Sequence, residues 1–205
     1  MKTAPKDFFT KSMDDISKIA QDLKYQAGVF EKMAQIISNA RQKEGRLFFC
    51  GVGGGAGNGT HATGDLFKSC EIKTICLTDN TPTITAITND EGWTEVFIDQ
   101  LRIWDMQKDD VLFVFSVGGG DIERNISANI VKAVSYAKEK GAYILGVVGK
   151  ANGYTAQNGD AVIVVPTANP NYRTTHTESW QSYIAHLLTE ALRQRSAKWE
   201  SVSEE

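Results

Sequence analysis

Two of the three histidines stand at a helical spacing from a carboxylate residue. His61 comes four residues before Asp65, and in a helix this spacing places both side chains on one face. Glu178 comes eight residues before His186, a little over two turns, so these two also share a face. Imidazole nitrogens and carboxylate oxygens are donors for a divalent transition metal, most commonly Zn²⁺. The four residues together indicate a metal site.

The spacing has two other interpretations that the sequence leaves open. A His–Asp pair four residues apart often makes only a contact on a helix surface. His186 lies within the apolar stretch "IAHLL", which also suits a hydrogen-bonded histidine in the core.

Two glycine-rich segments suit a phosphate, because glycine lets backbone N–H groups approach an anion closely. The first, residues 51–59, follows the apolar run "RLFFC". The second, residues 118–120, precedes Ser127, which is placed to cap the next helix and to donate to a phosphate. The alternatives are a turn without a ligand at residues 51–59 and a purely structural cap at Ser127.

The first segment also satisfies the dinucleotide pattern G-x-G-x-x-A, through Gly51, Gly53 and Ala56. Asp79 lies at the end of the next apolar run, where a dinucleotide-binding fold places its ribose-binding acid. Against this alternative, about 45 residues precede the first apolar run, and further glycines weaken the helix that should follow the loop at once.

The elements that position these residues can be read from hydrophobic periodicity. Residues 7–42 have apolar positions at helical spacing, which indicates one long helix or two consecutive ones. Five short apolar runs follow, with helical stretches between them, and their continuous Val, Ile, Leu and Phe content is typical of parallel strands buried on both faces. They are residues 46–50, 72–77, 111–116, 142–149 and 161–166. We therefore predict a doubly wound α/β domain with a parallel sheet.

In such a sheet, ligands bind beyond the carboxyl ends of the strands. The segments after three strands carry the unusual chemistry: residues 51–61, 78–90, which we interpret as a loop, and 116–129. Crossover helices are expected at 93–106 and 126–141, and a final helix at 175–194 carries Glu178 and His186.

Composition excludes several other classes. The chain has 205 residues and a formal net charge of −3, so it lacks the basic excess that binding to nucleic acid requires. No apolar run approaches the roughly 20 residues that span a bilayer, and residues 1–15 lack the apolar core of an export signal. The cysteines, Cys50, Cys70 and Cys76, are odd in number and suit free thiols. We expect a cytoplasmic protein without a membrane or nucleic-acid partner.

Across nearly its whole length the chain resembles the sugar isomerase (SIS) domain family, and within it the phosphoheptose isomerases. The likeness is carried by "CG" before the glycine-rich segment, "AITNDEG", "SANIVKA", and the last helix with its carboxylate eight residues before "HLL". His61 matches the metal-binding histidine of the family, Asp65 the glutamate that binds metal and moves the proton, Glu178 a glutamine, and His186 the second histidine.

The resemblance implies a three-layer α/β/α sandwich with a five-stranded parallel sheet of the flavodoxin-like type, as one domain over residues 1–205. Residues 1–45 would form helices used in packing a homotetramer, and residues 198–205 a polar tail. It also implies Zn²⁺, a phosphorylated sugar substrate and an enediol mechanism, with Asp65 as base and His186 as acid. The substrate-binding positions it implies are Val52, Gly53, Gly54, Gly55, Asn89, Asp90, Ser116, Val117, Gly118, Ser127 and Glu178.

The chain also departs from the family. Val52 and Gly55 replace a polar Asn and Ser of the first loop. The phosphate loop becomes "SVGGGDIERNIS", which inserts about six residues and brings in Asp121 and Glu123, carboxylates that repel a phosphate unless Arg124 or a metal offsets them.

The expected function is metal-dependent isomerisation of a phosphorylated sugar, most similar to conversion of sedoheptulose 7-phosphate to D-glycero-D-manno-heptose 7-phosphate for a surface polysaccharide. The alternatives are a non-catalytic regulatory SIS protein, of the kind that binds a replication initiator, and an NAD(P)-dependent oxidoreductase.

Overall fold

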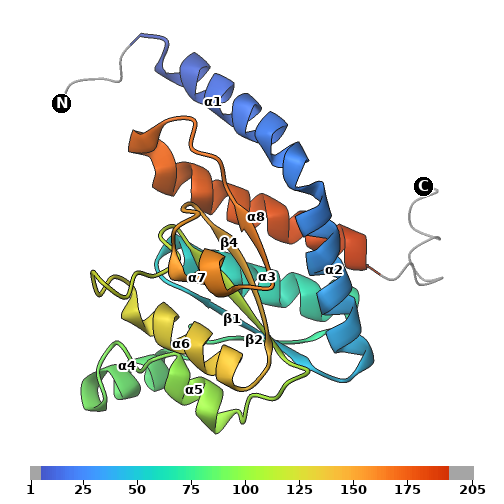
Figure 1. Ribbon diagram of the computed structural model, residues 1–205, viewed down its shortest axis with the longest axis vertical. Coiled ribbons are helices and arrows are strands. Elements are labelled where there is room, and N and C mark those ends of the chain that lie inside the picture. The colour runs from blue at the N-terminus through green and yellow to red at the C-terminus, as the bar shows by residue number, and fades with distance from the viewer. Residues whose placement is uncertain (1–5, 194–205) are drawn as a thin grey trace.

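The computed structural model describes residues 6–193, in which five parallel strands form one sheet between two layers of helices (Figure 1). The expected polar tail, residues 198–205, lies outside the described residues. The strands are β1 (Arg46–Gly51), β2 (Lys73–Cys76), β3 (Val111–Ser116), β4 (Tyr143–Val148) and β5 (Ala161–Val164). The helices are α1 (Phe8–Leu23), η1 (Lys24–Gln26), α2 (Ala27–Gln42), α3 (Gly54–Cys70), α4 (Thr81–Asp90), α5 (Ile98–Ile103), α6 (Ala128–Glu139), α7 (Tyr154–Asn158), η2 (Pro170–Tyr172) and α8 (Arg173–Leu192).

The strand order is β2-β1-β3-β4-β5, which is the flavodoxin-like arrangement. The chain leaves β1 toward one edge of the sheet and returns to start β3 on its other side, so the topological switch point lies between β1 and β3. Both glycine-rich segments follow these two strands. The predicted fold class is therefore confirmed.

Two apolar clusters hold the layers together. One packs α2, α3 and α8 against one face of the sheet, with Met33, Leu66 and Ile184 fully or almost fully buried. The other packs α5 and α6 against the opposite face, around Phe97 and Val134. Both faces of the strands are covered, which is why the strand sequences are apolar without alternation.

The N-terminal region forms the consecutive helices α1 and α2, separated by the single turn η1. In Figure 1, α1 runs outward from α2 and reaches along α8. The expected use of this region in packing a homotetramer stays a prediction.

Helix α3 forms although it is rich in glycine, because two of its glycines lie against the sheet. A Cβ at Gly55 would collide with the carbonyl oxygen of Phe115 in β3, and one at Gly59 would lie 3.3 Å from Cys76 Sγ. Positions 55 and 59 are one turn apart, so they form a smooth strip that brings the helix backbone close to the strands. The glycines thus set the depth at which α3 lies on the sheet.

Two expectations about local structure were wrong. Residues 78–90, expected as a loop, contain α4, in which the Asn80 side chain accepts a hydrogen bond from the Thr83 N–H and Pro82 occupies the first turn. Both features start helices, and the abundant β-branched threonines concealed them. The crossover helix expected at 93–106 is only α5, Ile98–Ile103, with turns on either side.

The three cysteines are free thiols and are buried, as expected. Burial raises the pKa of the Cys50 thiol far above its ordinary value. Thiols of this kind are inert, since the thiolate is the reactive form.

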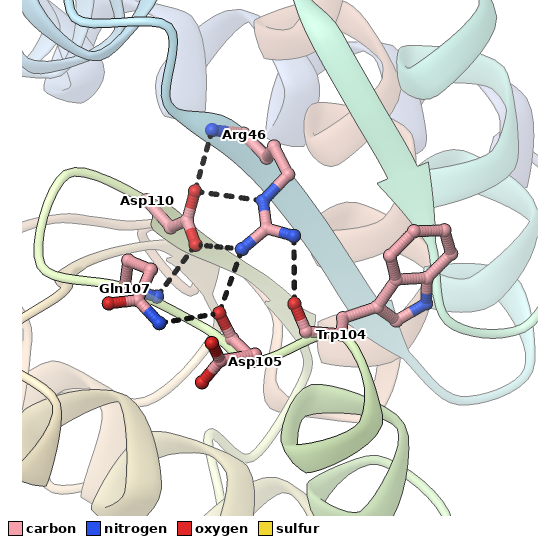
Figure 2. A network of polar contacts seen from close by, with 5 residues as sticks. All are labelled: Arg46, Trp104, Asp105, Gln107 and Asp110. Carbon is pink, nitrogen blue, oxygen red and sulfur yellow. Dashed lines mark hydrogen bonds and ion pairs between the residues drawn. The ribbon is translucent and has the colours of Figure 1, made fainter.

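An ion pair between a buried carboxylate and a partly exposed arginine joins the beginnings of β1 and β3 (Figure 2). The carboxylate of Asp110, whose side chain is 3% exposed, accepts hydrogen bonds from the backbone N–H, Nε and Nη2 of Arg46 and from the backbone N–H of Gln107. The guanidinium also donates to the backbone carbonyls of Trp104 and Asp105. This network fixes the strand edge opposite the one at which ligands are expected.

Replacing Asp110 with asparagine removes the negative charge paired with Arg46 and one of the buried oxygens that accept its hydrogen bonds. We expect the free energy of unfolding to fall by about 2 kcal/mol, because buried hydrogen bonds to a charged acceptor are lost. Urea unfolding followed by circular dichroism measures it. The matched control is Asp109→Asn, which removes an exposed pair with Lys43 and should leave the stability nearly unchanged. Equal stabilities of the two variants would contradict a structural role for the network.

Candidate metal centre

Three of the four predicted metal ligands converge between α3 and α8. Asp65 Oδ2 lies 3.5 Å from His61 Nε2 and 3.2 Å from His186 Nδ1, and the two imidazole rings meet edge to face with centroids 5.0 Å apart. Their ligand atoms all lie within 4.8 Å of one another. The helical spacing predicted that His61 and Asp65 lie together, and the packing of α8 beside α3 adds His186.

The chemistry of this donor set fits a divalent transition metal. Two imidazole nitrogens and one carboxylate oxygen are a typical set of three protein ligands at a catalytic zinc site, which keeps its fourth position for water or substrate. The side chains of His61, Asp65 and His186 are 58%, 30% and 49% exposed, so a ligand can reach them. His176, the third histidine, is buried elsewhere on α8 and is not in the group.

Glu178, predicted as the fourth ligand, is not part of this group. Its carboxylate lies against the backbone of Gly54 at the N-terminus of α3, where any side chain at position 54 would collide with it. A carboxylate is favourable at a helix N-terminus because of the partial positive charge there. The sequence spacing predicted that Glu178 and His186 share a face of one helix. It did not predict which residues of α3 each would contact, and two turns of α8 place Glu178 beside Gly54 and His186 beside Asp65.

The predicted substrate positions of the first loop lie at the start of α3. Val52 is 45% exposed, and Gly53 and Gly54 are exposed as well. Gly53 has a φ of 60°, which favours glycine. Gly55 is buried against Phe115 of β3, so the lack of a side chain there serves packing, and a serine would not fit without a shift of the backbone.

The other predicted contacts are dispersed along the same edge. Asn89 and Asp90 are exposed at the end of α4, where the Asn89 amide donates to the Asp90 carboxylate. Asp79, the acid of the dinucleotide alternative, instead accepts a 2.5 Å hydrogen bond from Thr60 of α3. That contact gives Asp79 a role in packing α3 against the end of β2.

The second glycine segment is tied into the protein itself. Ser116 is buried, and its Oγ accepts a hydrogen bond from the Gly119 N–H. The carbonyls of Gly119 and Gly120 accept from the backbone N–H groups of Thr155 and Tyr154 at the start of α7. Val117 and Gly118 are partly buried between them.

The cap expected from Ser127 is not formed. Ser127 does occupy the N-cap position of α6, but its φ of 50° and ψ of 47° are left-handed, and its side chain makes no capping hydrogen bond. An extended backbone is needed for the hydroxyl to reach the N–H groups of the first turn. The preceding residues form a tight hairpin, in which Asp121 and Ile126 exchange backbone hydrogen bonds, and this sets the unusual entry into α6.

Two polar residues that we did not predict, Asn58 and Gln181, join the two helices that carry the His–Asp–His cluster. Gln181 of α8 is fully buried, and its amide donates to the carbonyl of Val147 in β4. Its Oε1 accepts from the Asn58 amide of α3 at 3.2 Å, and Asn58 also donates to the Glu178 carbonyl at 2.8 Å. Asn58 and His61 are three residues apart, so this bond fixes α8 within one turn of the ligands. The sequence did contain a signal for this role, since Gln181 lies among the apolar positions of the last helix.

Comparison with known proteins identifies the class. Residues 9–149 match the SIS domain family, and the chain belongs to that family. Among its relatives is the phosphoheptose isomerase of Rhodospirillum rubrum, with 30% identity over 79% of this chain and 83% of the relative. Another is the lincomycin biosynthesis protein LmbN of Streptomyces lincolnensis, with 32% identity over 76% of this chain. That match spans only 58% of the length of LmbN.

Solved structures agree with the fold. The phosphoheptose isomerase GmhA from Neisseria gonorrhoeae has a TM-score of 0.75 at 24% identity, covering 90% of this chain and 94% of its own. A phosphoheptose isomerase from Francisella tularensis has a TM-score of 0.77 at 22% identity, covering 91% of this chain and 95% of its own. Within residues 6–193, no helix has the length and apolar character needed to cross a bilayer.

Replacing His61 or His186 with alanine is expected to weaken Zn²⁺ binding more than about 100-fold, because each removes a donor from a three-donor site. Glu178→Gln is the matched variant on the same helix and should keep the affinity within about threefold, since its carboxylate lies outside the donor group. Competition against a chromogenic chelator measures these affinities. A loss for Glu178→Gln as large as that for the histidine variants would contradict the three-donor site.

Gln181→Met keeps the volume of the side chain but removes its buried hydrogen bonds with the Val147 carbonyl and the Asn58 amide. The Asn58 amide keeps its bond to the Glu178 carbonyl, and the change is expected to cost about 2 kcal/mol of stability. If the Asn58–Gln181 bond also positions α8, metal affinity falls about tenfold. Leu188→Ala, a purely apolar change in the same helix, serves as the control. It should lower stability by a similar or larger amount while leaving metal affinity of the folded protein unchanged.

Proposed function

We propose that this protein is a metal-dependent aldose–ketose isomerase acting on a phosphorylated sugar. The observation that carries the proposal is the convergence of His61, Asp65 and His186 at an accessible surface of a SIS-domain fold. Relatives named phosphoheptose isomerase, which the match covers over 83% and 71% of their own length, support this reaction class.

Asp65 is the proposed base that moves a proton between C1 and C2 of the open-chain sugar. Both of its contacts with the imidazoles are made by Oδ2. The second carboxylate oxygen, Oδ1, is therefore available to take the proton from one carbon and return it to the other. Aspartate in place of the family's glutamate is shorter by one methylene, so the sugar must approach α3 more closely.

His186 is the proposed acid at the sugar oxygen. Its Nδ1 faces Asp65 and the donor group, which leaves Nε2 as the ring nitrogen that can carry a proton to substrate. One nitrogen cannot bind a metal and donate a proton at the same time, so the two roles fall to opposite sides of the ring. When bound by these residues, a divalent cation would supply Lewis-acid stabilisation of the negative charge that develops on the sugar oxygen.

The finer parts of the proposal come from the resemblance. They are sedoheptulose 7-phosphate as the substrate, D-glycero-D-manno-heptose 7-phosphate as the product, a surface polysaccharide pathway, Zn²⁺ as the metal, a homotetramer and a cytoplasmic location. The exposed backbone of Gly53 and Gly54 would line the sugar, with Glu178 beside them, and Asn89 and Asp90 would lie across from it.

The experiment that tests the proposal follows sedoheptulose 7-phosphate by NMR with Zn²⁺ and with chelator. Conversion to the aldose is expected with metal only. Asp65→Asn should lower kcat by about 100-fold or more, as removal of a general base does. Glu190→Gln, an exposed carboxylate on the same helix as His186, is the control and should leave kcat unchanged. Absence of conversion under every metal would reject the heptose reaction. Equal activity of Asp65→Asn and the wild type would reject Asp65 as the base.

A further inference from the structure

A cavity lined by two cationic residues lies where β4 and β5 end, away from the histidine cluster. Its volume is about 440 Å³. Lys150 follows β4, and Arg173 is the first residue of α8. The lining residues are Gly149, Lys150, Ala151, Asn152, Val164, Val165, Pro166, Thr167 and Arg173. Two of these are cationic and none is a carboxylate.

The two cations lack an acidic partner. Among the ion pairs between residues 6 and 193, neither Lys150 nor Arg173 takes part in one. The Arg173 Nε donates to Thr167 Oγ1 at 3.2 Å, which orients the guanidinium at the wall of the cavity. Two like charges lining one cavity repel each other unless an anion lies between them.

Close packing around Gly149 creates this arrangement. A Cβ at Gly149 would collide with the hydroxyl of Thr177 and would lie 3.3 Å from Arg173 Cγ. Glycine therefore allows the first turn of α8 to sit directly on the segment that follows β4, which brings Arg173 to the same cavity as Lys150. The cavity is at the carboxyl edge of a parallel sheet, where α/β proteins bind ligands, and the N-terminus of α8 adds partial positive charge.

The neighbouring cavity has a different charge. It is about 490 Å³ in volume and is lined by the hairpin residues Asp121, Glu123 and Arg124 together with α7. Asp121 accepts a hydrogen bond from the backbone N–H of Arg124 and lies 4.0 Å from its Nε. A small cavity of about 40 Å³ between the two is lined by both Asp121 and Lys150. The carboxylates offset the cation on the hairpin side, so an anion is attracted to the side on which Lys150 and Arg173 line one cavity.

The cavity is too far from the histidine cluster to hold the phosphate of a sugar bound there within one chain. Arg173 and His186 are thirteen residues apart on α8, a rise of about 20 Å. A seven-carbon chain with bonds of about 1.5 Å spans only on the order of 10 Å. We infer that Lys150 and Arg173 form a separate binding site for a phosphate-class dianion, distinct from the proposed isomerase centre.

Calorimetric titration of the full chain with inorganic phosphate tests this site. One phosphate per chain is expected, and Lys150→Met and Arg173→Met should each weaken binding at least about tenfold. Arg173→Lys keeps the charge and should retain part of the affinity. Lys108→Met, an exposed lysine remote from the cavity, should bind as the wild type does. Thermal melts confirm that each variant is folded.

His61→Ala separates this inference from the proposed function. It should lose metal and activity but bind phosphate as the wild type does. The site is overturned if the wild type takes up no phosphate at millimolar concentrations, or if Lys150→Met and Arg173→Met both bind as the wild type does. Loss of phosphate binding in His61→Ala would overturn its independence from the metal centre.

Discussion

The His61–Asp65–His186 cluster, the candidate metal site, depends on the close packing of α3 and α8 against each other and against the sheet. Gly55 and Gly59 let α3 lie directly on the strands, and Gln181 ties α8 to Val147 of β4 and to Asn58 of α3. Buried polar groups are costly unless each is paired, so these hydrogen bonds permit one register between the helices and penalise others. His61, Asp65 and His186 meet because that register is fixed.

The two ends of the sheet have different tasks. At the beginnings of β1 and β3, the buried carboxylate of Asp110 pairs with Arg46 and stabilises the strand edge. At the carboxyl ends, the same strands lead into glycine-rich segments, whose backbone can approach other groups closely. This division is typical of α/β proteins, in which one edge contributes stability and the other carries ligands.

The polar groups of the segment that follows β3 are bonded within the protein itself. Ser116 hydrogen-bonds to its own loop, Gly119 and Gly120 bond to α7, and Asp121 to Ile126 form a hairpin. Those polar groups are engaged within the protein, whereas Lys150 and Arg173, one strand further along, have no acidic partner in the described part of the chain. At the carboxyl edge of the sheet, the positive charges without an acidic partner therefore lie beyond β4 and not in the segment that follows β3.

The sequence by itself determined the class of fold, since continuous apolar runs separated by helical periodicity leave few arrangements other than a parallel sheet covered on both faces. It also determined that His61 and Asp65 share a face of one helix, because that relation is local. Helix α4 was missed because its threonines favour strands, while its cap and proline acted locally to start a helix.

Only the tertiary structure decided which distant residues meet. It brought His186 to Asp65 and left Glu178 two turns away against Gly54, although both lie on one face of α8. Spacing along a helix determines the direction in which each side chain points. Which residue it contacts depends on the neighbouring helix, on how deeply that helix lies on the sheet, and on the register between the two helices. Here those are set by glycines that admit the backbone and by a buried Asn–Gln bond between α3 and α8.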